Sequence, residues 1–239
     1  CRRRKGMCSM ILGRSNQHTL RENRPAPAVK ICGLTDPDQA LAIADMGADA
    51  IGVIGVAGTP RYVDERERRA LFQHLELAAP EVERVWVVAD LPDHELSRGL
   101  ADHGTPTVVQ LHGEESPQRC LQLKKDHPQT RFWKAMRLRT PEQLQRVEAY
   151  LDSVDALLVD AWSPDQLGGT GHRLPLEWLS EARLPIPWWL AGGISSEWIP
   201  ELLSQVSPDG LDASSRLEVR PGWKDLNKVT SLLKAVRRE

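Results

Sequence analysis

The sequence predicts a single α/β domain folded as a (β/α)8 TIM barrel. From Val29 onward, short apolar runs rich in β-branched residues alternate eight times with segments of helical periodicity. Strand-then-helix repeats are typical of a parallel sheet, and eight repeats in roughly 210 residues fit a compact closed barrel. An open doubly wound sheet is the second interpretation. It normally has fewer strands, and no G-x-G-x-x-G fingerprint follows the first run.

The eight apolar runs are the predicted strands. They cover residues 29–34, 50–54, 84–89, 107–111, 132–138, 156–160, 187–191 and 210–213. The final helix is predicted from an amphipathic stripe, because apolar side chains recur on one face of a 3.6-residue period. The stripe consists of Leu226, Val229, Leu232, Leu233 and Val236.

Four of the intervening segments carry helix start signals. Asp36-Pro37 and Thr140-Pro141 each combine a capping side chain with proline at the first helical position, and a glutamine follows three residues past each cap. Ser116-Pro117 repeats the device, and Asp64 provides a weaker version with a glutamate three residues on. We therefore expect helices to begin at these points.

Residues 1–28 differ from the rest of the chain. They are rich in arginine, contain a single acidic residue, Glu22, and end in Pro25-Ala26-Pro27-Ala28. We interpret them as a flexible basic extension without a catalytic role, and residues 29–239 as the barrel. The same composition is typical of a transit peptide, which leaves a plastid location open. A functional basic arm is less favoured, because no aromatic residues are interleaved with the arginines.

Composition restricts the class of partner. The net charge is −2 over 239 residues, so the chain offers no field for nucleic acid or a membrane surface. No apolar stretch approaches the ~18 residues of a transmembrane helix. The four cysteines (Cys1, Cys8, Cys32 and Cys120) lack CxxC or CxxH spacing, which argues against a metal site or a disulfide framework and fits a reducing cytoplasm. A small molecule is the expected partner.

Two predicted strands end in side chains suited to acid–base chemistry. Catalytic groups of such barrels project from the C-terminal ends of strands, where Cys32 ends the first strand and Asp160 the sixth. A thiol has a free pKa of ~8.5, so a base at Cys32 needs a nearby cation, for which Lys30 is a candidate. Asp160 would have to stay protonated, which burial favours. The competing interpretations are a small core residue and a loop-capping carboxylate.

The last two units carry the signals of a phosphate site. The seventh predicted strand ends in Gly192-Gly193, and Ser214-Ser215 follows the eighth. Glycines let backbone N–H groups approach an anion closely, and the loops after strands seven and eight commonly bind phosphate in these barrels. A tight turn and a helix cap would explain either pair alone. Both pairs in consecutive units favour phosphate binding.

Three further segments are candidates for substrate binding. The loop that holds Gly168, Gly169 and Gly171 follows the sixth strand and can fold over a ligand, although a plain connection is equally consistent. Arg61, after the second strand, can anchor an anionic group or be an exposed loop residue. His112, after the fourth strand, can contact substrate or be satisfied by neighbouring loops.

Taken together, these segments resemble the phosphoribosylanthranilate isomerase family of tryptophan biosynthesis. The resemblance extends from Val29 to the C-terminus. It rests on Lys30-Ile31-Cys32-Gly33-Leu34-Thr35, Gly47-Ala48-Asp49-Ala50, Pro60-Arg61-Tyr62, Gln110-Leu111-His112-Gly113, Leu158-Val159-Asp160, Gly168-Gly169-Thr170-Gly171, Ala191-Gly192-Gly193-Ile194, Leu211-Asp212-Ala213-Ser214-Ser215 and Pro221-Gly222-Trp223-Lys224-Asp225. No single segment is decisive, but nine in the same order are specific.

The resemblance implies a barrel of the ribulose-phosphate-binding type that performs an Amadori rearrangement without cofactor or metal. By motif, Asp160 would be the general acid that protonates the ribose ring oxygen, and Cys32 the general base that removes the C2′ proton. Arg61 would lie near the anthranilate carboxylate. The phosphate would bind the glycine and serine loops after strands seven and eight, helped by the 168–171 loop. A monomer or weak homodimer is expected.

Two segments depart from the family pattern. Residues 55–59 read Gly-Val-Ala-Gly-Thr where the family has a longer aromatic stretch, which predicts a looser cover over the anthranilate ring. Arg216 stands where the family has a glycine after its two serines, and it could add positive charge near the phosphate. Neither departure touches Cys32 or Asp160.

Three alternatives are weighed against this interpretation. A histidine-pathway sugar isomerase performs the same rearrangement on a similar barrel, but it would have aspartate at position 32. Indole-glycerol-phosphate synthase relies on a lysine acid, whereas the first strand here ends in cysteine. A non-catalytic sugar-phosphate sensor would keep the glycine and serine loops, but it would have no reason to retain Cys32 with Asp160.

Overall fold

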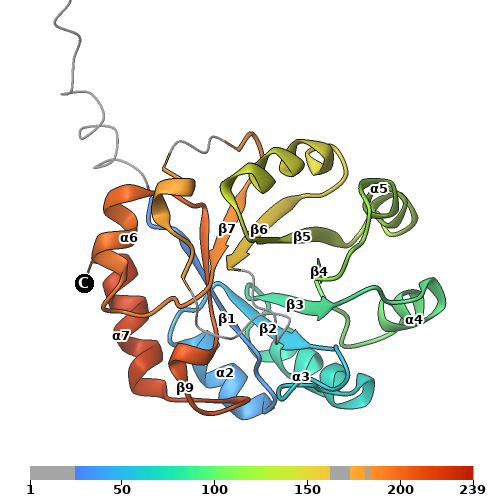
Figure 1. Cartoon of the computed structure of the whole chain (residues 1–239). Helices are drawn as coiled ribbons and strands as arrows, with labels where there is room; N and C mark the ends of the chain where they lie inside the picture. The colour runs from blue at the N-terminus through green and yellow to red at the C-terminus, as the bar shows by residue number, and fades with distance from the viewer. Residues whose placement is uncertain (1–24, 162–172, 181–183, 239) are drawn as a thin grey trace, which may run out of the picture.

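Eight parallel strands close into a barrel in sequence order, as the sequence predicts (Figure 1). The computed structural model describes residues 25–161, 173–180 and 184–238. The strands are β1 (Ala28–Cys32), β2 (Ala50–Ile54), β3 (Glu83–Val88), β4 (Val108–Leu111), β5 (Arg131–Leu138), β6 (Ala156–Ala161), β7 (Trp188–Ala191) and β8 (Gly210–Ala213). Because β1 pairs with both β2 and β8, the sheet has no edge and the open doubly wound alternative is wrong.

Helices and short helical turns surround the strands (Figure 1). They are α2 (Pro37–Asp45), α3 (Glu65–Ala78), α4 (Asp93–Gly99), α5 (Pro117–Asp126), η1 (Pro141–Tyr150), η2 (Leu176–Trp178), α6 (Ile199–Gln205), η3 (Ser215–Leu217) and α7 (Leu226–Arg237), of which the three η elements are 3-10 helices. A two-stranded antiparallel hairpin of β9 (Glu218–Arg220) and β10 (Trp223–Lys224) lies between η3 and α7. No helix in the described part combines the length and apolarity needed to cross a membrane.

Three of the four predicted helix starts are capped as expected. The carboxylate of Asp36 accepts from the Gln39 backbone N–H at 2.8 Å, and Ser116 and Asp64 cap α5 and α3 in the same way. The prediction for Thr140 is wrong, because its side chain makes no cap hydrogen bond and the segment is a 3-10 helix. The Thr140 hydroxyl bonds the Glu142 carboxylate instead.

The core has two apolar layers. The inner layer fills the barrel and consists of Ala50, Val85, Val108, Trp133, Ala135, Ala156, Leu158, Trp189 and Ala191. The rings of Trp133 and Trp189 stack there with centroids 4.6 Å apart, and Gly210 leaves the space that the Trp189 ring occupies. The outer layer lies between strands and helices and includes the predicted stripe of α7, of which Val229, Leu232, Leu233 and Val236 are buried.

Leu232→Ala should lower the free energy of unfolding by about 2–5 kcal/mol, because it opens a cavity in the fully buried outer layer. Leu77→Ala is the matched control: Leu77 also lies in a helix but is 79% exposed, so its effect should stay within about 0.5 kcal/mol. Urea unfolding measures both. Equal losses in the two variants would contradict the placement of the α7 stripe in the core.

Candidate active site

Cys32 and Asp160 face the same mouth of the barrel, as the sequence predicts. Cys32 is the last residue of β1, and Asp160 is the last but one of β6. Side chains two apart on a strand share a face, and Leu158, two residues before Asp160, belongs to the inner layer. Both Cys32 and Asp160 are 5% exposed. A thiol and a carboxyl therefore project into the interior from different strands.

Lys30 lies one layer below Cys32 and is fully buried. Its ammonium donates to both Asp212 carboxylate oxygens at 3.0 Å and to Gln110 Oε1 at 2.9 Å. Burial acts to lower the pKa of Lys30, but the charge of Asp212 and the neighbouring thiol outweigh it and raise the pKa. Lys30 is therefore a cation inside the barrel, held by Asp212 on the adjacent strand β8 and by Gln110 on β4 across the interior.

The structure qualifies the prediction that Lys30 activates Cys32. Burial raises the pKa of the Cys32 thiol, and the opposing effect of Lys30 is the next largest influence. The cation is thus where it was expected, but desolvation of a thiolate outweighs it in the absence of substrate. Cys32 is a thiol at neutral pH in this state.

His112 lies beside Asp160. Its Nε2 is 4.0 Å from Asp160 Oδ2, and its Nδ1 is 3.0 Å from the Gln110 amide nitrogen. Burial lowers the pKa of His112 to about 3, and the charges of Lys134, Arg137 and Lys30 act in the same direction. The imidazole is therefore neutral at neutral pH.

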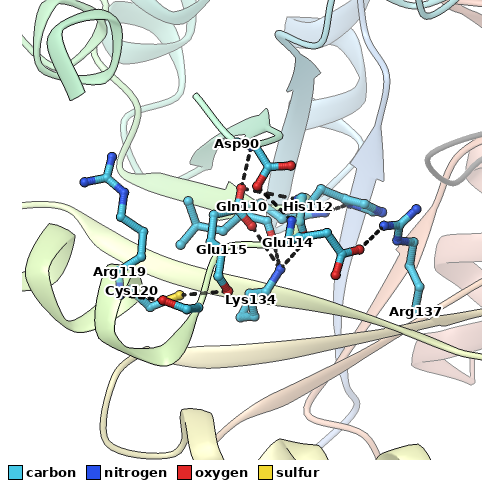
Figure 2. Close-up of polar contacts among 12 residues, drawn as sticks. Asp90, Gln110, His112, Glu114, Glu115, Arg119, Cys120, Lys134 and Arg137 are labelled. Carbon is cyan, nitrogen blue, oxygen red and sulfur yellow. Dashed lines mark hydrogen bonds and ion pairs between the residues drawn. The ribbon is translucent and has the colours of Figure 1, made fainter. Parts of the chain in front are cut away.

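A buried ion pair fixes the loop that carries His112 (Figure 2). Lys134 donates to Glu115 Oε2 at 3.0 Å and to the carbonyl of Gly113 at 2.7 Å. The other oxygen of Glu115 accepts from the backbone N–H groups of Asp90 and Gly113. Sequence reasoning missed this pair because Lys134 points outward from the middle of β5, where no motif marks it.

Asp90, which follows β3, and Arg137, on β5, connect the ends of these two strands. Both bind Glu114 (Figure 2): Asp90 Oδ1 accepts from its backbone N–H at 2.8 Å, and Arg137 Nη2 donates to its carboxylate at 2.7 Å. Asp90 has a left-handed backbone with φ +49°, which permits this contact. The two residues thus join the ends of β3 and β5 through the loop after β4.

Arg61 is oriented by an acidic partner that the sequence analysis did not single out. Its Nε and Nη2 donate to the two carboxylate oxygens of Glu218 at 2.8 and 2.7 Å. Lys224 also donates to Glu218, at 2.7 Å. Burial acts to raise the pKa of Glu218, but its bonds to Arg61 and Lys224 lower it to about 2. Arg61 is therefore buried and fixed, which excludes the exposed-loop interpretation.

One of the two predicted phosphate loops contacts the end of β1. Gly192 and Gly193 have φ of +94° and +67°, a conformation that side chains rarely adopt. The Ser214 hydroxyl donates to the Cys32 carbonyl at 3.0 Å, and Ser215 begins η3. Ser214 thus connects the loop after β8 to the end of β1.

Gly168, Gly169 and Gly171 lie outside the described residues. Within the described ranges, no group of three or more His, Cys, Asp or Glu side chains is arranged to hold a metal ion. The chemistry of the described rim therefore consists of a thiol, a carboxyl, a neutral imidazole and two backbone loops suited to an anion.

These features define a (β/α)8-barrel enzyme of the acid–base class. The model of the N-(5'phosphoribosyl)anthranilate (PRA) isomerase family matches residues 29–235. The chain belongs to this family.

Relatives and solved structures agree with the family assignment. The N-(5'-phosphoribosyl)anthranilate isomerase of Synechocystis sp. is 45% identical over 207 residues, which cover 87% of this chain and 94% of that protein. The one from Gloeothece citriformis is 42% identical over 210 residues, 88% and 94% of the two chains. The crystal structure of the Thermotoga maritima enzyme superposes with a TM-score of 0.79 at 27% identity, covering 89% of this chain and 100% of that one.

One solved relative contains a ligand. The crystal structure of a phosphoribosyl anthranilate isomerase in complex with reduced 1-(o-carboxyphenylamino)-1-deoxyribulose 5-phosphate has a TM-score of 0.73 at 26% identity, covering 89% of this chain and 100% of that one. That protein therefore binds a phosphosugar that carries an aromatic carboxylate.

Glu218→Gln should make stability less dependent on pH in the acid range. The lowered pKa of Glu218 means that its contribution is complete above the ordinary value of 4.5 and is lost as pH falls toward about 2. Urea unfolding of wild type and variant across this range should show a difference that shrinks with acidity. Glu81→Gln, at an exposed position, is the control. A difference that stays constant with pH would contradict the ion-pair assignment.

Proposed function

We propose that this chain converts N-(5-phospho-β-D-ribosyl)anthranilate to 1-(2-carboxyphenylamino)-1-deoxy-D-ribulose 5-phosphate in tryptophan biosynthesis. The observation that carries the proposal is the buried thiol and carboxyl, Cys32 and Asp160, at one mouth of a barrel of this family. Substrate and product are isomers, so the reaction needs only the movement of protons and no redox partner. General acid and base groups supply that chemistry.

The first step is ring opening. The proton of Asp160 goes to the ribose ring oxygen, the bond between that oxygen and C1′ breaks, and the nitrogen lone pair forms a C1′=N bond. The product is a cationic Schiff base with a free 4′-hydroxyl. Burial of Asp160 favours the protonated carboxyl that this step requires.

The second step is proton removal by Cys32. After the thiol has released its own proton to solvent, the thiolate takes the C2′ proton, and the electrons of that bond form C1′=C2′ while the C1′=N electrons return to nitrogen. The enolamine then tautomerises to the ketone by losing the 2′-hydroxyl proton and gaining one at C1′. The pKa of the thiol is raised before substrate binds, and the positive charge of the Schiff base beside it would favour the thiolate.

The two anionic ends of the substrate have separate binding groups in this proposal. The phosphate binds the loops of Gly192, Gly193, Ser214 and Ser215, with the 168–171 loop as a further candidate. Arg61 meets the anthranilate carboxylate from the side of the guanidinium that Glu218 leaves accessible. Glu218 engages only Nε and Nη2, and a guanidinium offers five donors.

Assembly and compartment belong to the same proposal. We expect a monomer or weak homodimer that works in the cytoplasm, or in a plastid if residues 1–28 act as a transit peptide. The barrel places both candidate catalytic residues on one chain, so a partner subunit is not required for the chemistry.

Cys32→Ala should reduce kcat by on the order of 10³-fold with KM nearly unchanged, because it removes the base without touching the anion sites. Asp160→Asn should reduce kcat by a similar factor, because it removes the general acid. Both are measured by the loss of anthranilate fluorescence after freshly generated substrate is added. Cys120→Ala, a buried cysteine on α5, and Asp152→Asn, on the surface, are matched controls that should keep wild-type turnover. If the wild type binds the substrate without turning it over, the proposed isomerase activity is wrong and the chain is a binding protein.

Gly193→Ala should raise KM about tenfold or more with a smaller effect on kcat. The added methyl displaces a backbone donor from the phosphate, and a hydrogen bond to a charged group contributes about 1.5–3 kcal/mol. Gly47→Ala is the control, because its φ of +96° also lies in the left-handed region and the three atoms nearest to its added methyl belong to the flexible end of Arg237. Equal KM values in the two variants would contradict the placement of the phosphate at the Gly193 loop.

A further inference from the structure

Gln110 lies between Lys30 and His112 in the barrel interior and is 1% exposed. Its side chain makes two contacts: Oε1 with the Lys30 ammonium at 2.9 Å, and the amide nitrogen with His112 Nδ1 at 3.0 Å. The chain of contacts continues from Lys30 to Asp212 and from His112 toward Asp160. It crosses the barrel from β8 and β1 to β4 and β6. Figure 2 shows Gln110 and His112 as neighbours.

The direction of these hydrogen bonds follows from Lys30. An ammonium has only hydrogens to offer, so the atom of Gln110 that meets it must be the carbonyl oxygen. The NH₂ group of Gln110 therefore points at His112 and donates to Nδ1. Nδ1 accepts with its lone pair and carries no proton. In a neutral imidazole one nitrogen must carry the proton, so it lies on Nε2.

The neutral state of His112 is supported independently. Burial is the largest influence that lowers the pKa of His112 to about 3, and the positive charges of Lys134, Arg137 and Lys30 act in the same direction. Nε2 is buried and has no hydrogen-bond partner among the residues that the structure describes. The N–H of Nε2 faces Asp160 at 4.0 Å.

We propose that Lys30 and Gln110 are positioning residues that hold His112 in the Nε2–H tautomer, so that the ring cannot accept the proton of the general acid. This inference rests on the proposed role of Asp160. An Nε2 lone pair at this position would accept a hydrogen bond from the protonated carboxyl and keep its proton away from the substrate. An Nε2–H group cannot. It can only donate, and its N–H dipole, with Nε2 4.0 Å from the carboxyl, stabilises the carboxylate that Asp160 becomes after ring opening.

The first test reads the tautomer directly in the wild-type protein. In ¹⁵N-histidine-labelled protein, two-bond correlation spectra at neutral pH distinguish a protonated ring nitrogen from an unprotonated one. His112→Gln assigns the resonance by its disappearance. We expect a protonated Nε2 and an unprotonated Nδ1. A protonated Nδ1, or a ring charged at both nitrogens, overturns the proposal, and this arm needs no substrate and no turnover.

The second test reverses the tautomer. In Gln110→Glu the carboxylate accepts from Lys30 and has no N–H for Nδ1, so the ring should turn its proton toward position 110 and expose a lone pair on Nε2. We expect the spectrum to reverse and kcat to fall at least tenfold, a part of the roughly 10²–10⁴-fold that a general acid contributes. KM should change little, because neither anion site is altered.

Controls separate the tautomer from a general effect of the substitution. Gln205→Glu makes the same chemical change at the exposed end of α6 and should leave spectrum and kcat unchanged. A Gln110→Glu protein that keeps the Nε2–H spectrum overturns the role of Gln110. If the tautomer reverses and kcat stays at the wild-type value, the proposed effect of the His112 tautomer on Asp160 is overturned. If the variant does not fold, the wild-type spectrum decides alone. A wild type with the expected tautomer but no turnover contradicts the proposed function and not the tautomer.

Discussion

The ion pair between Lys30 and Asp212 is the interaction on which the barrel interior and its mouth both depend. A fully buried ammonium is strongly destabilising without a partner, and Asp212 supplies one from the strand next to β1. The pair therefore spans the seam where the last strand meets the first. Held by this ion pair, Lys30 acts on its surroundings in two ways. Its charge acts to lower the pKa of Cys32, against the effect of burial, and its ammonium orients the side chain of Gln110.

The barrel interior contains a polar cluster as well as its apolar side chains. The stacked tryptophans and small aliphatic side chains fill part of the interior, and Lys30, Gln110 and Asp212 form a polar cluster beside them, two residues before Cys32, His112 and Ser214 along the chain. Water is largely excluded from this cluster, so each electrostatic interaction is stronger than it would be at the surface. The same burial raises the pKa of Cys32 and lowers the pKa of His112, so that both shifts disfavour the charged form.

The sequence predicts the fold closely, because strand runs and helix caps are local signals. All eight strands lie within two residues of the predicted runs, and the wrong cap at Thr140 arose where a side chain found a nearer partner at Glu142. The mouth is predicted less completely. Cys32 and Asp160 can be identified because barrel geometry places strand ends together. The partners of Arg61, Lys30 and Lys134 cannot be identified in this way. Glu218 is 157 residues from Arg61 along the chain, and Asp212 is 182 residues from Lys30. Such pairs depend on tertiary packing that no local pattern encodes.

The contacts around the β9–β10 hairpin affect the entropy that is lost when a ligand binds. Ser214 holds the carbonyl of Cys32, Lys224 lies against both Ser214 and Glu218, and Glu218 holds Arg61. The candidate base, the candidate phosphate loop after β8 and the arginine proposed for the carboxylate are thus joined by one network of contacts. Because these long side chains lose their rotameric freedom when the chain folds, little of that entropy remains to be lost at the encounter. The entropic cost of ordering these side chains is therefore met when the chain folds, and binding of a ligand adds little to it.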